Sequence, residues 1–223
     1  MDPVTISDAF VAVQRKLNKT AQVAGRRADE VTLIAVSKQQ QDNRIDASLA
    51  AGHRIFGENR VQEAKTRWTQ RKRLHPDLCL HLIGPLQSNK TAEAVHLFDV
   101  IHTVDRPKIA TAIAAEATKQ NKEINCFIQV NTGEEPQKSG IAPGDLADFL
   151  AFCRTQAGLS VIGLMCIPPI DEEAAMHFAL LKTLADRHEL TNLSMGMSGD
   201  YEEAVGFGAT HVRVGSALFG ARI

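Results

Sequence analysis

Short apolar runs alternate with longer amphipathic stretches along almost the whole chain of 223 residues. The apolar runs are bounded by glycine, proline and polar residues, which is typical of buried parallel strands, whereas the amphipathic stretches have helical spacing. Strands are predicted at residues 31–38, 54–57, 78–83, 99–104, 124–130, 160–167, 193–196 and 210–214. Each is followed by a predicted helix, at residues 42–51, 58–73, 89–98, 106–119, 143–157, 172–188, 200–207 and 216–219. The pattern therefore predicts eight strand–helix units in succession.

Alternating strands and helices favour a parallel sheet, because each helix returns the chain to the edge where the next strand begins. Eight such units in about 200 residues favour an α/β fold with a closed (β/α)8 barrel of the TIM type. An open doubly wound sheet is the alternative, since the run at 193–196 is short enough to be a loop. A further helix is predicted at 6–24, before the first strand. No linker divides the chain, so we expect one domain over residues 1–223, with the N-terminal helix in 1–24 and the barrel in 31–223.

Composition excludes several classes of function. A formal net charge of −1 gives no electrostatic reason to expect nucleic acid or an anionic membrane as partner. No apolar run approaches membrane-spanning length, and the first residues do not resemble a secretory signal, so we expect a cytoplasmic protein. We also expect a monomer, because no self-complementary apolar stripe stands out. The eight histidines show no metal-binding spacing. The cysteines form no CxxC pair, and we expect reduced thiols at Cys79, Cys126, Cys153 and Cys166.

The first predicted strand ends in a lysine, Lys38. At the mouth of a barrel, apolar walls would lower the pKa of this amine, and a neutral amine can form a Schiff base with a carbonyl compound. The alternative is a lysine that simply leaves the strand for solvent, which is the commoner arrangement for a strand-end lysine taken alone. The other residues predicted at the same mouth distinguish between a Schiff-base lysine and a solvent-exposed one.

Two glycine turns predict a phosphate site. Barrels of this type bind ligands at the carboxyl ends of their strands, and phosphate commonly lies after strands seven and eight at the start of a short helix. Those two places read 196–200, Gly-Met-Ser-Gly-Asp, and 214–217, Val-Gly-Ser-Ala. Glycine lets a phosphate approach the backbone N–H groups, and Ser198 and Ser216 add side-chain donors. A capping serine explains either turn alone, but the two together favour phosphate.

Arg213 lies between Val212 and Val214 in the last apolar run. A buried arginine needs a partner, usually a carboxylate. No strand interior supplies an obvious aspartate or glutamate, so we expect an acceptor on a ligand. A lysine, two phosphate turns and an arginine at one mouth fit pyridoxal 5′-phosphate (PLP), which carries an aldehyde and a phosphate. A Schiff-base enzyme for sugar phosphates would use a similar set.

Seven sequence blocks resemble, in the same order, the pyridoxal phosphate homeostasis protein family, which is related to the N-terminal domain of alanine racemase. They lie at residues 36–38, 56–59, 81–90, 138–140, 163–165, 194–198 and 213–222. The resemblance implies a fold-type III PLP barrel in which Lys38 holds PLP as a Schiff base. It also implies cofactor contacts, with the phosphate at Ser198, Gly215 and Ser216, the pyridine nitrogen at Arg213 and the ring near Asn59.

The resemblance implies a role in intracellular PLP homeostasis and amino- and keto-acid balance, with PLP and PLP-dependent apoenzymes as partners and no established catalytic residue. Met165 is a further candidate, which would either pack against the ring or fill the core. Two positions depart from the family pattern. Gln39 stands where threonine is common, and Arg60 stands where an aromatic residue is common, which puts the polarity of the pocket rim in doubt.

The alternative function is a PLP-dependent enzyme acting on amino acids, such as a racemase. PLP stabilises carbanions best when its ring nitrogen is protonated, and an arginine at that nitrogen can only donate. Two-base racemisation also needs a second acid or base on the far face of the cofactor. The chain has one tyrosine, Tyr201, beside a phosphate turn, where a surface position at a helix start is the expectation. We therefore predict a PLP-binding protein and keep the racemase as the alternative.

Overall fold

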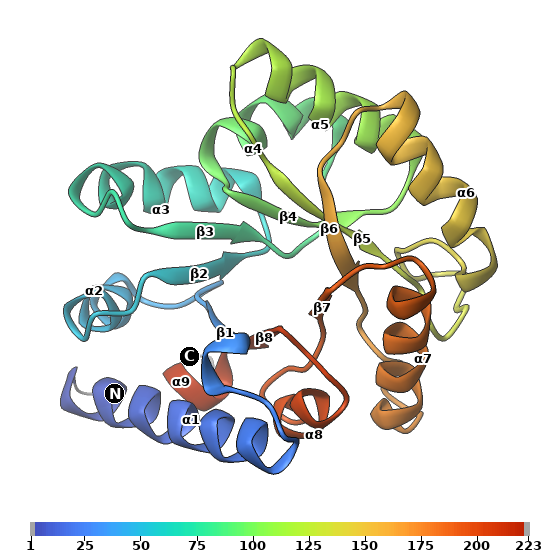
Figure 1. Ribbon diagram of the computed structural model, residues 1–223. Coiled ribbons are helices and arrows are strands. Elements are labelled where there is room, and N and C mark those ends of the chain that lie inside the picture. The colour runs from blue at the N-terminus through green and yellow to red at the C-terminus, as the bar shows by residue number, and fades with distance from the viewer. Residues whose placement is uncertain (1–2, 221–223) are drawn as a thin grey trace.

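Eight parallel strands close into a barrel in the order β1 to β8, and β8 pairs with β1 (Figure 1). The strands of this computed structural model are β1 Thr32–Val36, β2 Ile55–Glu58, β3 Cys79–Leu82, β4 Val100–Val104, β5 Asn125–Gln129, β6 Val161–Met165, β7 Asn192–Ser194 and β8 His211–Val214. The predicted (β/α)8 barrel is confirmed, and the open sheet is wrong. The short run that left the open sheet as an alternative is a true strand, since β7 pairs with β6 on one side and β8 on the other.

The structure describes residues 3–220, so the ends of the predicted domain and the last two residues of the block at 213–222 lie outside it. The α-helices are α1 Pro3–Val23, α2 Asp42–Ala50, α3 Val61–Leu74, α4 Thr91–Leu97, α5 Pro107–Lys119, α6 Leu146–Ala151, α7 Ala174–Arg187, α8 Tyr201–Gly206 and α9 Ser216–Phe219. Short 3-10 segments are η1 Ala28–Glu30, η2 Ser88–Lys90 and η3 Pro143–Asp145, and η4 Phe152–Gln156 is a π-helix that continues α6. Within this part of the chain, no helix is both long enough and apolar enough to traverse a bilayer.

One helix begins later than predicted. The charged run after the second strand predicts a helix from residue 58, but α3 starts at Val61 and Glu58 is the last residue of β2. The side chain of Glu58 is fully buried, because its carboxylate accepts hydrogen bonds from Ser37, directly after β1, and from Arg67 and Trp68 of α3. The charged run alone predicted an exposed helix start here. Glu58 instead ends the strand, because Ser37, Arg67 and Trp68 bind its carboxylate in the folded protein.

Helix α1 lies outside the ring of strand–helix units and runs along α8 and α9 (Figure 1). Its buried side chains recur with helical spacing, at Ile6, Phe10, Val13, Leu17 and Ala21. The ring of Phe10 meets that of Phe219 edge-on, with centroids 6.1 Å apart. Helix α9 begins within the second of the two predicted phosphate turns, at residues 214–217. Because α1 packs against α9, it supports this part of the barrel mouth.

Candidate functional site

A cavity of about 290 Å³ opens at the carboxyl ends of the strands. Its walls come from β1, β2, β3, β6, β7 and β8 or from the residues that follow them. Six of the seven predicted cofactor contacts line it, namely Lys38, Asn59, Ser198, Arg213, Gly215 and Ser216. The seventh, Met165, lies deeper in the barrel, fully buried against Val100 and Phe127.

Lys38 lies in a tight turn that begins directly after β1. The turn is closed by a hydrogen bond of 3.1 Å from the backbone N–H of Gln40 to the carbonyl of Ser37. The side chain of Lys38 is half-buried and faces the cavity. Gln39 has a φ of +58°, a conformation in which a β-branched residue is strained. Glutamine therefore suits this turn better than threonine would.

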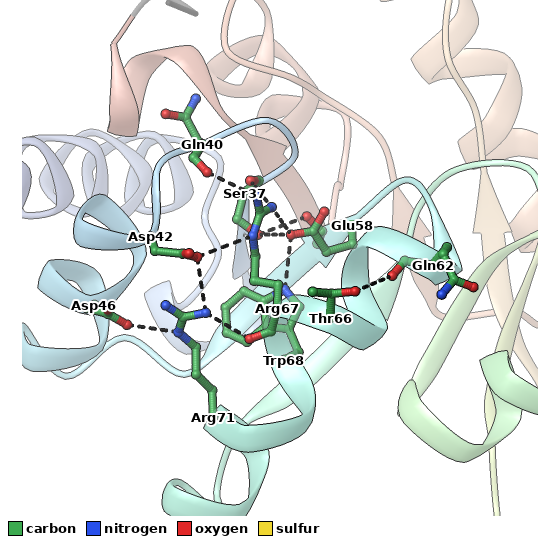
Figure 2. Close-up of polar contacts among 11 residues, drawn as sticks. Ser37, Gln40, Asp42, Asp46, Glu58, Gln62, Thr66, Arg67, Trp68 and Arg71 are labelled. Atoms are coloured by element: carbon green, nitrogen blue, oxygen red, sulfur yellow. Dashed lines mark hydrogen bonds and ion pairs between the residues drawn. The ribbon is translucent and has the colours of Figure 1, made fainter.

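Arg67 of α3 holds both ends of the Lys38 turn (Figure 2). Its guanidinium donates to the carbonyl of Ser37 at 2.9 Å and to the carbonyl of Gln40 at 3.0 Å. It also donates to the Oε1 atom of Glu58 at 2.9 Å. One planar group thus ties the lysine-bearing turn to a helix and a neighbouring strand, which fixes the backbone from which Lys38 projects.

Glu58 is the buried carboxylate that the sequence did not reveal. Its Oε1 atom also accepts hydrogen bonds from the Ser37 hydroxyl at 2.8 Å and the Trp68 indole at 3.0 Å (Figure 2). Glu58 is the last residue of β2, and it pairs with Arg67 rather than with Arg213. The available sequence signals were the single tryptophan, Trp68, and Glu58, which lies two positions after Phe56. Nothing in the sequence indicates that these two residues are in contact.

The turns after β7 and β8 meet at the cavity wall. The Ser198 hydroxyl accepts hydrogen bonds from the backbone N–H groups of Gly215, at 3.1 Å, and Ala217, at 3.4 Å. These N–H groups therefore lie at the same wall as the Ser198 side chain. Gly196 has a φ of +90°, and a Cβ atom there would lie 2.6 Å from the Cβ atom of Ala204. Only glycine allows the first of these turns to take its path.

Arg213 is a buried cation held by neutral acceptors. It is 4% exposed, and it donates to the Ser194 hydroxyl at 2.6 Å and the Cys166 carbonyl at 2.9 Å. No carboxylate of residues 6–220 forms an ion pair with it, as the sequence led us to expect. Burial lowers the pKa of Arg213 from its ordinary value, although a guanidinium stays charged at neutral pH. The cavity therefore has a positive floor, which favours an acceptor or an anion.

Three histidines, His81, His102 and His211, cluster inside the barrel, and two of them contact the ring of Phe127. Nδ1 of His81 lies 2.8 Å from Nε2 of His102, and the His102 and Phe127 rings stack with centroids 4.4 Å apart. Burial lowers the pKa of His81 to about 3 and that of His211 to about 4, and it holds the pKa of His102 well below its usual range. All three imidazoles are therefore neutral at physiological pH. His81 is buried, and both of its ring nitrogens have a hydrogen-bond partner.

Two residues that the sequence left in question lie away from the cavity. Tyr201 is 4% exposed and packs in the apolar core, so the expected surface position is wrong. The side chain of Arg60 is 73% exposed and pairs with Glu63 at 2.9 Å. Neither residue forms part of the cavity wall. The doubt that Arg60 raised about the polarity of the rim is thereby removed.

Comparison with known proteins gives a consistent result. Residues 12–223 match the family model described as alanine racemase, N-terminal domain. The chain is 42% identical to the pyridoxal phosphate homeostasis protein of Pseudomonas aeruginosa, with 98% of this chain and 96% of the relative covered. It is 37% identical to the protein of the same name from Escherichia coli K12, with 97% of each chain covered.

Among solved structures, PipY of Synechococcus elongatus with PLP bound is 36% identical and superposes with a TM-score of 0.83, over 96% of this chain and 100% of PipY. The same protein without PLP superposes with a TM-score of 0.86. An alanine racemase from Clostridium difficile has a TM-score of 0.69 at 11% identity, and this chain covers 56% of its length. That last similarity extends to the fold alone.

Proposed function

The chain belongs to the pyridoxal phosphate homeostasis protein family, and we propose that it binds PLP covalently at Lys38. The observation that carries the proposal is one cavity lined by both Lys38 and Arg213, a buried cation that forms no ion pair with a carboxylate of residues 6–220. PLP offers one group for each feature, an aldehyde for the amine and a ring nitrogen that accepts from the guanidinium. When bound, PLP supplies an electron sink for amino-acid chemistry.

The remaining wall residues fit the other groups of PLP. We assign the phosphate to Ser198, Gly215 and Ser216, which lie where two strand-to-helix turns meet. Asn59 would lie near the ring. Its Oδ1 atom is buried and has no hydrogen-bond partner among the described residues, so it can accept from a ligand. We leave Met165 out of the contact set, because it lies below the wall.

We further propose that the protein stores and delivers PLP, and so takes part in PLP homeostasis and amino- and keto-acid balance. Of the wall residues that the structure describes, Lys38 and Arg213 alone are ionisable, and a guanidinium does not give up its proton, so the lysine is the one candidate acid or base among them. Two-base racemisation requires a second acid or base on the opposite face. The racemase alternative would have to draw that group from elsewhere.

PLP-dependent apoenzymes are the recipients that we propose. Ile167 and Met197 are partly exposed apolar residues at the cavity wall, where an incoming protein would meet them first. We place the protein in the cytoplasm, since its four cysteines are free thiols, as proteins of a reducing compartment have. We propose that it acts as a monomer, because one chain supplies every wall residue named above.

The test is to record the near-visible spectrum of the purified protein, reduce it with borohydride and map the modified lysine. A yellow protein labelled at Lys38 is expected. A colourless protein that takes up no added PLP, or a label on another lysine, would refute the assignment. Racemisation of free amino acids at about one turnover per second or faster, lost in Lys38→Ala, would establish the enzyme alternative instead.

A further inference from the structure

An unbroken chain of side-chain hydrogen bonds runs through the barrel from the cavity toward its opposite end. It leads from Arg213 to Ser194, at 2.6 Å, and from Ser194 to Nδ1 of His102, at 2.8 Å. It continues from Nε2 of His102 to Nδ1 of His81, at 2.8 Å, and from Nε2 of His81 to the Cys79 sulfur, at 3.3 Å. Cys79 is the first residue of β3, so the chain ends at the amino-terminal side of the barrel.

The direction of the first two bonds follows from counting hydrogens at Ser194. Arginine can only donate, so the Ser194 oxygen accepts from Arg213. The hydroxyl hydrogen then needs an acceptor, and Nδ1 of His102 is the sole remaining partner of this side chain among the described residues. If His102 donated instead, a fully buried hydroxyl hydrogen would have no partner. Ser194 therefore donates, and His102 accepts at Nδ1.

The direction then passes through both rings. A neutral imidazole carries one N–H, so His102, which accepts at Nδ1, donates from Nε2 to Nδ1 of His81. His81 in turn donates from Nε2 to the sulfur of Cys79. Every bond points away from the cavity. The lowered pKa values of both histidines support this assignment, because a doubly protonated ring would break the sequence of donors.

We propose that Ser194, His102 and His81 are positioning residues. Their hydrogen bonds keep both histidines as Nε2–H tautomers and thereby fix the guanidinium of Arg213 toward the PLP ring. The proposal rests on the proposed function, because it takes Arg213 as the residue that faces the ring. The single hydroxyl hydrogen of Ser194 is donated to His102, so its oxygen presents one fixed acceptor to Arg213. With the Cys166 carbonyl as the second acceptor, two guanidinium nitrogens are anchored and the plane of the group is set.

The tautomers can be measured in the ligand-free protein by long-range proton–nitrogen correlation spectra of a histidine-labelled sample. The expected result is an unprotonated Nδ1 and a protonated Nε2 on both His81 and His102, unchanged across neutral pH. A proton on Nδ1 of His102, or averaging between the two tautomers, would overturn the proposal. Because no PLP is present, this outcome is independent of whether the proposed cofactor binds.

Ser194→Ala tests the consequence for the cofactor. It removes one of the two acceptors of Arg213 and the donor to His102. We expect PLP to be released about tenfold faster, with a shift in the absorption maximum of bound PLP. Ser194→Thr keeps the hydroxyl and should restore both properties. His53→Gln is the matched control, since His53 is a mostly buried histidine that takes no part in this series of hydrogen bonds. Its ring is hydrogen-bonded to the Ile55 carbonyl. Wild-type release and spectrum in Ser194→Ala, or equal changes in the control, would contradict the proposal; if Ser194→Ala fails to fold, the tautomer measurement still decides.

Discussion

The interior histidines should make the fold sensitive to mild acid. His81 and His102 are almost fully buried, and burial lowers the pKa of His81 to about 3 and that of His102 well below its usual range. In the unfolded chain both rings titrate near about 6.5. As the pH falls below that value, the unfolded chain gains protons that the folded protein does not bind. Stability is therefore fully present above pH 6.5 and falls with decreasing pH until the folded rings titrate.

The expected loss can be worked out for each ring. Between pH 7 and pH 5, a histidine that stays neutral in the fold costs about 2 kcal/mol of unfolding free energy. The two rings together cost about 4 kcal/mol, which is a large part of the about 5–15 kcal/mol that stabilises a typical domain. His53 and His211, whose pKa values burial lowers to about 4, also stay mostly neutral at pH 5 and add to the loss in the same direction.

Urea unfolding, followed by the fluorescence of the single tryptophan, Trp68, measures this loss at several pH values. His102→Asn should reduce the pH dependence between pH 7 and 5 by about 2 kcal/mol, even though the variant is less stable at pH 7. His96→Gln is the control, because that side chain is exposed and its removal should leave the pH dependence unchanged. Carboxylates add little in this window, since their unfolded pKa values lie near about 4. A wild-type stability at pH 5 within about 1 kcal/mol of that at pH 7 would refute the reasoning.

Three further predictions concern the frame of the cavity. Arg67→Ala should lower the unfolding free energy by about 3–5 kcal/mol, because it leaves the Glu58 carboxylate buried without its counter-charge, and urea unfolding would measure this. Gly163→Ala should prevent folding at 37 °C, as judged by circular dichroism, because a Cβ atom there would lie 2.1 Å from the carbonyl oxygen of Asn192. Lys38→Ala should abolish the borohydride-trapped PLP adduct while changing the unfolding free energy by less than about 1 kcal/mol, since it removes a half-buried side chain at the cavity wall.

The sequence predicted the barrel because its signal is repeated along the whole chain. Each apolar run forms a strand and each amphipathic stretch contributes a helix, so an error at one boundary does not change the topology. The displaced helix start at Glu58 shows the limit. Whether a glutamate after an apolar run is exposed depends on Arg67 and Trp68 from the next helix, and that contact exists only once the fold has formed.

The site was predictable to the extent that topology determines it. In a (β/α)8 barrel, strand ends converge on one mouth, so Lys38, Ser198 and Arg213 could be brought together without coordinates. The chain of hydrogen bonds beneath them could not be predicted. His102 and Ser194 are separated by 92 residues, and their contact depends on the register and tilt of strands that are not neighbours in the barrel.

The two ends of the cavity are joined by protein contacts that need no ligand. Arg44 of α2 donates to the Gln40 side chain, at 3.0 Å, and to the carbonyl of Phe219, at 2.9 Å. Gln40 closes the lysine-bearing turn, and Phe219 ends α9, which follows the phosphate turn. The spacing between the Lys38 turn and the phosphate turn is therefore set by α2, α3 and α1 rather than by the cofactor. Such a preformed site would bind PLP with little loss of chain entropy and release it without unfolding, as the proposed delivery to another protein requires.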